Sequence, residues 1–598
     1  MKWLNKTVGQ LSGRYDLTPA RWGACALLAL CAVCLSWRLG FGGSAGALVL
    51  FVCMFWLARR EWAKPSPAYV RGWTGVFALL FSAALTAARL VRGCTDIEGD
   101  RLANYIEWEG KKDILLLLPL AVLLWLVFLQ LQRLAKRHSI NGITPRPGSK
   151  KVFAIIWGLI FLCWVPFLLA FWPAGLVGDG AQALEEALGQ GAPSGNHWVV
   201  LYILTLRLFV RLAAVFGGGL SVALCLYAVA QSLAFSAACA AVVYKLYTLG
   251  VPRLAVAACG LMYACSGFFA TYGMAAWKDT LFSAAAVLLS LQLWDFSAHG
   301  ISRRGTLAAL ATMLFLCFWR NNGLYVVAPT LVVLAIACRG KARRLLAAGV
   351  ATLAVVVVVQ GPVYDACGIA KDSLNESISV PLQQLAATIN EDRPLTEEQQ
   401  AVLFTILPEE EWRSAYMPCL SDPLKGNARL NTGYLQENFG SFLKVWAQLL
   451  PANLDVYVEA YLLQTLGFWK PGSWLGYYYD YFVGIQDMYG HGITGVDWFE
   501  AWTGHGLAGA LQETTRFISS GTMVWVMLGA FFFCLCKPKG KRKGDLLLLT
   551  PLVFSWLSLM VAVPIAQSYR YILMLPVALP LLCLLFVYDR PAEGKTLS

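Results

Sequence analysis

The chain has 598 residues, of which 58% are hydrophobic and only 14% are charged. Soluble domains carry roughly a quarter charged residues, so this composition excludes a soluble protein. The formal net charge of +13 could indicate a nucleic-acid partner. The basic residues instead cluster in short segments between long apolar runs, which is the pattern of cytoplasmic loops in a polytopic membrane protein. We therefore expect the lipid bilayer as a partner and no nucleic acid.

The apolar runs predict an all-α polytopic membrane protein with about fourteen transmembrane helices. We expect these spans near residues 22–37, 42–58, 71–91, 113–132, 152–174, 220–243, 254–272, 280–295, 305–318, 324–338, 344–362, 519–536, 545–563 and 571–588.

Charge between the spans sets the orientation and the domain boundaries. Residues 1–132 form an N-terminal four-span module. Residues 133–151 form a strongly basic linker with Gly, Pro and Ser, and we expect it in the cytoplasm. A catalytic membrane core then covers 152–362, and its first outer loop is 175–218.

The end of that first loop decides the topology. Residues 197–215 are apolar, but Arg207 and Arg211 stand four residues apart. Arginines are costly at the bilayer centre, and one helical turn of spacing suits a helix lying at the membrane interface. If this segment crossed the membrane, every later basic loop would fall on the wrong side.

Residues 363–518 contain no clear span and many charges, so we expect an extracytoplasmic domain of mainly helices, with a helix start near Thr396. Residues 519–598 form a three-span segment and a cytoplasmic tail. The sequence thus predicts a multi-pass protein of the plasma membrane with both termini in the cytoplasm.

Four polar groups of residues fall on the outer face in this topology, each at the end of a span, where the fold can hold them around one cavity. They are Asp179 with Gln182, Asn196 and His197; Trp277, Lys278 and Asp279; Arg320, Asn321 and Asn322; and Gln567, Ser568, Tyr569, Arg570 and Tyr571.

A carboxylate at the membrane boundary can act as general base toward an acceptor hydroxyl, and Asp179 is our candidate for that base. Arginine and lysine clamp phosphate oxygens through charge-assisted hydrogen bonds. A carboxylate with cationic clamps suits transfer from a lipid-phosphate donor, because the cations stabilise the departing phosphate.

Structural roles are open for the same residues. Asp179 lies between two glycines and could be a turn residue. Lys278 and Asp279 could form an ion pair at the membrane boundary. Arg320 and Arg570 could be interfacial anchors, and the two asparagines after Arg320 could cap a helix or close a turn. The histidine before the interfacial helix could serve only to anchor it.

This order of elements resembles the GT-C superfamily of polytopic glycosyltransferases, which take sugars from polyprenyl-phosphate donors. It comprises an outward first span, an acidic residue at the membrane surface, an interfacial helix opened by histidine and a Gly-marked turn into the next span. The family's first-loop acidic base corresponds to Asp179. The sequence departs from the family's acidic pair at Gly180 and from its His-Pro motif at Trp198.

Residues 150–590 are also similar to a bacterial family of uncharacterised GT-C-like membrane proteins. The similarity rests on the order of motifs around Asp179, 196–197, 277–279, 320–323, 379–386, 421–425, 467–472 and 568–571.

The resemblance implies an inverting glycosyltransferase of the cell envelope, with a polyprenyl-phosphate sugar donor and an acceptor reached from the outer face. In this scheme Lys278, Arg320 and Arg570 contact phosphate. The sugar or acceptor site would be formed by Gln182, His197, Asp279, Asn321, Asn322, Gln383, Gln384 and Tyr569.

Two other functions stay open, namely a lipid or polysaccharide transporter or flippase, and a non-catalytic envelope assembly protein on the same scaffold. A flippase predicts charges within the spans and internal repeats. An assembly protein predicts that Asp179 and Arg570 do not share a cavity. No cofactor is firmly implied, although Asp179 and Asp279 could share a divalent cation.

Overall fold

The computed structural model describes residues 19–41, 43–92, 105–106, 108–139, 144–300, 302–338, 342–370, 374–472, 484–506, 518–562 and 568–588. Gln567 and the predicted cytoplasmic tail from 589 lie outside the described residues. Regular structure in the described part is helical, apart from two-residue strands β1 (Val91–Arg92) and β2 (Tyr105–Ile106). The predicted all-helical class is confirmed for these residues.

The chain divides into two compact units. The first consists of Met1–Arg92, Ile106–Ser139 and Phe532–Lys537, and the second contains the remainder. The helices of the first unit are α2 (Pro19–Leu39), α3 (Gly43–Ala63), α4 (Ala68–Leu90), η1 (Trp108–Leu116) and α5 (Leu117–Arg137).

Ion pairs join the helices of the first unit. The Asp113 carboxylate accepts from Arg38 and, at 3.2 Å, from Arg89, while Arg133 pairs with Glu61. The carboxylates of Asp113 and Glu61 are both largely buried, so each needs its arginine partner to offset the loss of hydration.

The second unit contains a bundle of long apolar helices. They are α6 (Lys150–Ala170), α9 (Leu220–Thr248), α10 (Arg253–Cys265), α11 (Gly267–Met274), α12 (Lys278–His299), α13 (Arg303–Trp319), α14 (Gly323–Cys338), α15 (Arg343–Val358), α27 (Ser520–Leu535) as far as residue 531, α28 (Lys539–Val561) and α29 (Met574–Val587). A π-turn η2 (Val359–Val363) and α16 (Tyr364–Ala366) extend α15, and η6 (Tyr569–Ile572) precedes α29. Helix α12 packs against α9, α13, α28 and α29, and it is buried on most sides, as expected for a helix that is apolar all round.

Nine helices in the described residues are long and apolar enough to cross a membrane, as in a multi-pass membrane protein. They are α2, α4, α5, α6, α9, α12, α15, α28 and α29. The bent pair α10–α11 makes a tenth if it counts as one span, and α14 and α27 are shorter apolar helices. Every predicted span coincides with a helix or this pair, but the predicted number of about fourteen membrane crossings is not confirmed.

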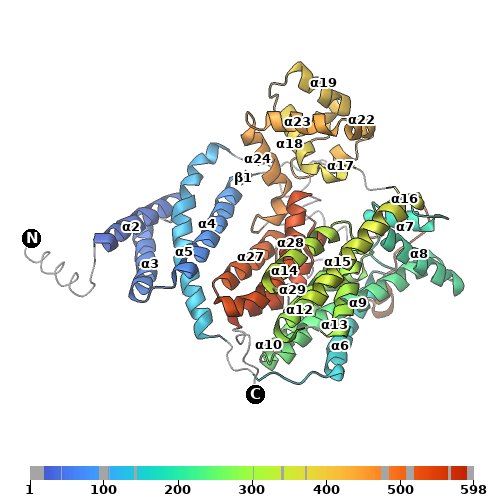
Figure 1. The fold of residues 1–598 in the computed structure, drawn as a ribbon, viewed down its shortest axis with the longest axis horizontal. Helices are drawn as coiled ribbons and strands as arrows, with labels where there is room; N and C mark the ends of the chain where they lie inside the picture. Colours follow the sequence, from blue (N-terminus) through green and yellow to red (C-terminus); the bar gives the residue numbers. More distant parts are fainter. Residues whose placement is uncertain are drawn as a thin grey trace, which may run out of the picture. The chain divides into compact units, whose positions relative to one another are not determined.

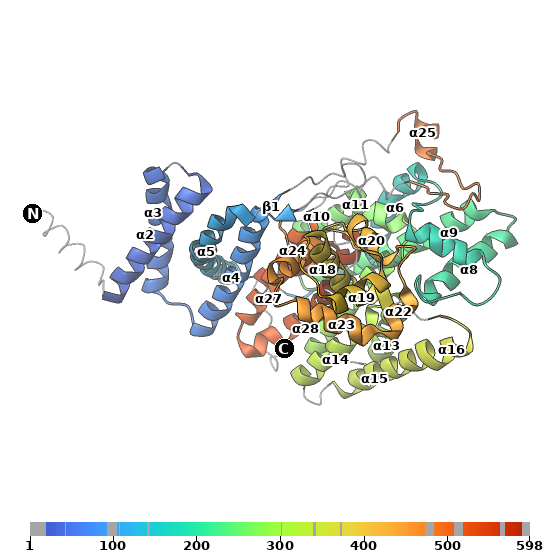
Figure 2. The same ribbon diagram turned by 90° about the horizontal axis from the view of Figure 1, so that it is seen from above.

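Two shorter helices follow α6, namely α7 (Asp179–Leu188) and α8 (Val200–Val215), and α8 lies beside α9 at the periphery of the unit (Figures 1 and 2). The Arg207 guanidinium donates to the backbone carbonyls of Ala187 at 3.2 Å and Glu186 at 3.3 Å. This arginine of the predicted interfacial helix therefore ties α8 to the end of α7. One side of α8 exposes an apolar stripe of Leu204, Leu208 and Leu212.

A polar helical subdomain covers residues 374–468 and gathers at one end of the bundle (Figures 1 and 2). It contains α17 (Leu374–Ser377), α18 (Ser379–Asn390), α19 (Glu397–Ile406), α20 (Glu409–Ser414), α21 (Asp422–Lys425), α22 (Thr432–Glu437), α23 (Phe439–Leu449), α24 (Leu454–Gln464) and η3 (Leu466–Phe468). Trp412 and Phe442 are buried in its own apolar core. Helix α19 begins with the capping box of Thr396 and Gln399, close to the predicted start. Beyond the subdomain, α25 (Trp498–Thr503) packs against α6.

Candidate active site

Asp179 is the first residue of α7 and directly follows an extended segment that leaves α6. The backbone N–H of Ala276 donates to the Gly175 carbonyl at 2.7 Å, and the N–H of Gly178 donates to the Gln486 side chain at 3.1 Å. Gly178 has φ of +48°, a left-handed turn that suits glycine. The backbone of the loop before Asp179 is therefore held by hydrogen bonds to two other segments.

Gly180 leaves no room for a side chain. A Cβ atom at this position would lie 2.4 Å from the carbonyl oxygen of Ala276, well inside van der Waals contact. A second acidic residue after Asp179 would therefore push α7 away from the segment before α12. The close approach of Ala276 therefore disfavours a second acidic residue directly after Asp179.

The Asp179 carboxylate forms an ion pair with Arg570, with Oδ2 at 2.9 Å from Nη1. The Arg570 side chain is only 8% exposed and that of Asp179 is 33% exposed. Burial alone would raise the pKa of Asp179, but the charges of Arg570 and Lys278 and the Arg570 hydrogen bond together outweigh it and lower that pKa. Asp179 is therefore ionised at neutral pH.

Asp279 lies near Asp179 and forms ion pairs with two arginines. Its carboxylate is 1% exposed and pairs with Arg320 through Oδ1 at 2.9 Å, while Oδ2 faces Arg570 Nε at 3.8 Å. The ring of Tyr571 lies 4.7 Å from the Arg320 guanidinium and 4.6 Å from that of Arg570. Each arginine is thus held by a carboxylate and an aromatic ring, which limits the orientations of its remaining N–H groups.

Lys278 begins α12 and faces the segment that leads into α8. Its ammonium donates to the His197 carbonyl at 3.3 Å and lies 5.3 Å from the centre of a Trp198 ring. The next residue, Val199, has φ of +66°, a conformation that costs a β-branched residue on the order of 1–3 kcal/mol and that the surrounding structure must maintain. The indole at position 198 thus provides a cation–π partner for Lys278.

The two asparagines after Arg320 connect separate segments. The Asn196 amide donates to Asn321 Oδ1 at 2.9 Å, and the Asn321 amide donates back to the Asn196 carbonyl at 3.1 Å. Asn322 donates to Ser558 Oγ at 3.3 Å. These bonds hold the loop before α14 against the loop before α8 and against α28.

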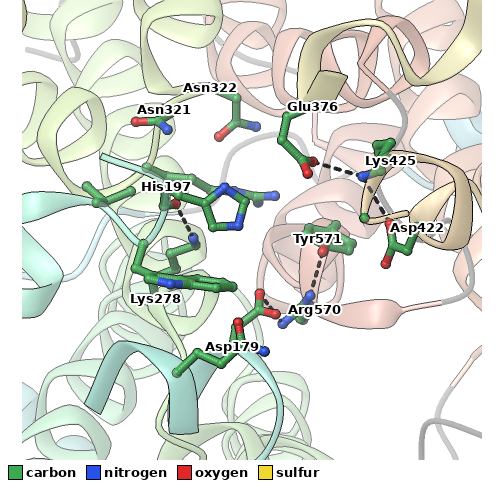
Figure 3. Close-up of a pocket in the computed structure, with 15 residues that line it drawn as sticks. Asp179, His197, Lys278, Asn321, Asn322, Glu376, Asp422, Lys425, Arg570 and Tyr571 are labelled. Atoms are coloured by element: carbon green, nitrogen blue, oxygen red, sulfur yellow. Dashed lines mark hydrogen bonds and ion pairs between the residues drawn. The ribbon is translucent and has the colours of Figure 1, made fainter. Parts of the chain in front are cut away.

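These groups surround one cavity of about 490 Å³ (Figure 3). It is lined by Asp179, Gln182, His197, Trp198, Val199, Lys278, Arg320, Asn321, Asn322, Glu376, Asp422, Lys425, Gly426, Arg570 and Tyr571. Eight of the twelve residues proposed from sequence are among them. Asp279 is not, but it contacts Arg320 and Arg570, which line the cavity.

Three proposed substrate contacts lie elsewhere. The Gln383 amide donates to the Met417 carbonyl. Gln384 donates to the Tyr457 carbonyl at 3.0 Å. Both glutamines are buried inside the helical subdomain, where their amides satisfy backbone groups. Their predicted role at the acceptor is corrected to packing within that subdomain.

Tyr569 is the third residue away from the cavity. It is buried, and its hydroxyl donates to the Ile518 carbonyl at 2.6 Å. In the short helix η6, the neighbouring Arg570 side chain reaches the cavity instead. Tyr569 therefore joins the start of α29 to the segment before α27.

The structure adds cavity residues that were not proposed as site residues from the sequence. Glu376, Asp422 and Lys425 come from the helical subdomain. Tyr571, from η6, belongs to the fourth polar group of the sequence but was given no role there. Asp422 and Lys425 belong to the segment 421–425, which carries part of the family resemblance, and that segment was the available signal. Nothing in the sequence distinguishes Glu376 from other acidic residues of its region.

Within the described ranges, no three His, Cys, Asp or Glu side chains come together in a way that could hold a metal ion. The carboxylates of Asp179 and Asp279 both face Arg570, at 2.9 and 3.8 Å. The cation shared by these two carboxylates is a guanidinium.

Residues 194–597 match the model of a family of unknown function, DUF6020, and the chain belongs to this family. Asp179 and Gln182 precede the matched residues. No curated protein matches the chain. No solved structure matches it either.

Proposed function

We propose that this DUF6020 protein is an inverting membrane glycosyltransferase that moves a sugar from a polyprenyl-phosphate donor to a cell-envelope acceptor. Its cavity would open on the outer face of the plasma membrane, with both termini in the cytoplasm. One observation carries the proposal. A carboxylate, Asp179, and three cationic side chains, Lys278, Arg320 and Arg570, line the same cavity at the ends of apolar helices.

These residues match the charges that change during the transfer. The acceptor oxygen attacks the anomeric carbon from the face opposite the phosphate, and the bond from that carbon to the phosphate oxygen breaks. Asp179 takes the proton of the acceptor hydroxyl. Its Oδ1 atom has no hydrogen-bond partner among the described residues, while Oδ2 contacts Arg570. The guanidiniums and the ammonium stabilise the lipid phosphate that departs with the bonding electrons.

Arg570 would couple donor binding to the basicity of Asp179, because it contacts both the carboxylate and the donor phosphate. Its charge lowers the pKa of Asp179 in the free protein. A donor phosphate that binds Arg570 neutralises part of that charge, so the pKa of Asp179 rises and the carboxylate becomes a stronger base once the donor is in place. Buried and held by Asp279, the guanidinium stays fixed while it serves both groups.

The test is transfer of label in membranes that contain the full-length protein and their own envelope material. Polyprenyl-phosphate sugars radiolabelled in the sugar are supplied, and label in the acceptor fraction is counted. We expect transfer by the wild type and a loss of at least 100-fold in Asp179→Asn, since general bases contribute about 10²–10⁴-fold. Glu410→Gln, which changes an exposed carboxylate paired with Arg429, is the matched control.

Three results would count against the proposal. Unchanged transfer by Asp179→Asn removes Asp179 as the base. Labelled lipid that crosses the bilayer without label reaching an acceptor favours a flippase. The absence of both label transfer and donor binding favours an assembly protein. That last alternative predicts that Asp179 and Arg570 do not share a cavity, whereas they lie 2.9 Å apart.

A further inference from the structure

The cavity has a second wall of different composition, formed by the helical subdomain. Lys425, on the short helix α21, pairs with Glu376 Oε2 and with Asp422 Oδ1, both at 2.9 Å. Figure 3 shows these three side chains across the cavity from Asp179 and Lys278. Two carboxylates thus share one ammonium on a wall that also lines the cavity.

Buried contacts hold the side chains of this wall in place. The Lys425 side chain is 8% exposed, and the Asn375 amide donates to the Lys425 carbonyl at 2.6 Å. That bond fixes α21 against α17, the helix that carries Glu376. Burial would lower the pKa of Lys425, but Asp422 and Glu376 outweigh it and raise that pKa, so the ammonium stays charged.

Each carboxylate keeps one oxygen for a ligand. Glu376 Oε2 and Asp422 Oδ1 are used by Lys425. Within the described part of the chain, Glu376 Oε1 and Asp422 Oδ2 accept no hydrogen bond. The side chains are 30% and 46% exposed, so a ligand in the cavity can reach both. Lys425 has its carboxylate partners already and is poorly placed to bind an anion.

The two walls therefore differ in charge. Three cations against the two carboxylates Asp179 and Asp279 leave one net positive charge on the membrane-helix side. Two carboxylates against Lys425 leave one net negative charge on the subdomain side. A bound molecule that carries an anionic group would experience repulsion at the second wall.

We propose that Glu376 and Asp422 form an acceptor subsite for a polyhydroxylated, non-anionic group that donates hydrogen bonds, and that they reject acceptors with carboxylate or phosphate at this position. The assignment of this ligand as the acceptor rests on the proposed function, because the subsite lies in the same cavity as Asp179. Hydroxyls of a neutral sugar and the ammonium of an amino sugar share the required chemistry.

Binding of three soluble probes to the full-length protein in nanodiscs tests the subsite. The probes are a neutral disaccharide, a disaccharide with a free amino group and a disaccharide with a uronic acid, measured by titration calorimetry. We expect the first two to bind and the third to bind at least about tenfold more weakly. We expect Glu376→Gln and Asp422→Asn each to weaken binding of the amino probe by about tenfold, since hydrogen bonds to charged groups are stronger than those between neutral groups.

The decisive result is a change of selectivity, which a purely structural role would not produce. The double variant Glu376→Gln, Asp422→Asn should bind the uronic acid probe more tightly than the wild type does. Glu410→Gln should leave all three affinities unchanged. Three results would overturn the proposal. The wild type could bind the uronic acid probe as tightly as the other two probes or more tightly, it could bind no probe, or both single variants could keep the wild-type affinities.

The outcome can be separated from that of glycosyl transfer. Asp179→Asn should keep the probe selectivity while it loses label transfer. Probe selectivity in a wild-type protein that transfers no label would support the subsite and reject the glycosyltransferase. Label transfer without probe selectivity would support the glycosyltransferase and reject the subsite.

Discussion

Asp179 and Arg570 form an ion pair of 2.9 Å between the start of α7 and the helix η6 that precedes α29. This pair brings together two of the four polar groups that the sequence places at separate span ends. It also sets the protonation of the carboxylate, because the Arg570 charge is the largest influence that lowers the pKa of Asp179.

The first prediction concerns pH. The pKa of Asp179 is lower in the folded protein than in the unfolded chain, so the pair stabilises the fold above the unfolded value and loses that effect as pH falls through the folded value. We expect Asp179→Asn to lower the free energy of unfolding by about 1–3 kcal/mol at pH 7. The difference from the wild type should shrink at acidic pH. Thermal unfolding in detergent over a pH series measures it.

Arg570→Met provides the complementary measurement. Without the guanidinium, burial should move the pKa of Asp179 upward. The pH below which Asp179→Asn no longer changes the free energy of unfolding should therefore be higher in the Arg570→Met background. A pH series that is identical in the two backgrounds would contradict the assignment.

The second prediction concerns Gly180. A methyl group there would lie 2.4 Å from the Ala276 carbonyl oxygen, so Gly180→Ala must shift α7 and with it Asp179. We expect a loss of about 1–3 kcal/mol in stability, as for other overpacked sites, and a fall in label transfer. Gly440→Ala in α23 is the control, because a Cβ at Gly440 meets nothing within 4 Å. Equal unfolding temperatures for the two variants would refute the steric argument.

The third prediction concerns the buried pair of Asp279 and Arg320, at 2.9 Å. Removing one partner of a buried ion pair typically costs about 3–5 kcal/mol, because the other charge is left without compensation. We expect Asp279→Asn and Arg320→Gln each to be strongly destabilising. The double variant should be less destabilised than the sum of the two, and unfolding temperatures of the four proteins measure this coupling. Additive effects would show that each residue is held mainly by Arg570 or Tyr571 instead.

Much of this organisation could be predicted from the sequence, because it follows from local patterns. Long apolar runs predict the helices, and every predicted span coincides with a helix or with the bent pair α10–α11. Asp179, Lys278, Arg320 and Arg570 stand beside those runs, and proximity to a span end was enough to propose them together. They all line one cavity.

What the sequence could not predict depends on contacts between distant segments. Gln383 and Gln384 lie within the segment 379–386 that carries part of the resemblance, but tertiary packing uses their amides to bond the Met417 and Tyr457 carbonyls. Glu376 has no distinguishing neighbours in sequence and reaches the cavity only because α17 packs beside α21. A polar side chain inside a helical domain can satisfy a backbone group or face a ligand, and only the fold decides which.

The fourth prediction concerns Trp198, where the resemblance leads one to expect proline. The Lys278 ammonium lies 5.3 Å from the centre of its ring and donates to the neighbouring His197 carbonyl. A cation–π contact at a partly exposed site contributes about 0.5–1 kcal/mol, so Trp198→Ala should weaken binding of a polyprenyl phosphate about two- to fivefold. Trp198→Phe keeps an aromatic face and should retain most of the affinity. Titration of the lipid phosphate into nanodiscs measures both variants. Equal affinities for the alanine and phenylalanine variants would show that the indole ring does not position Lys278, and that the carbonyl of His197 is sufficient.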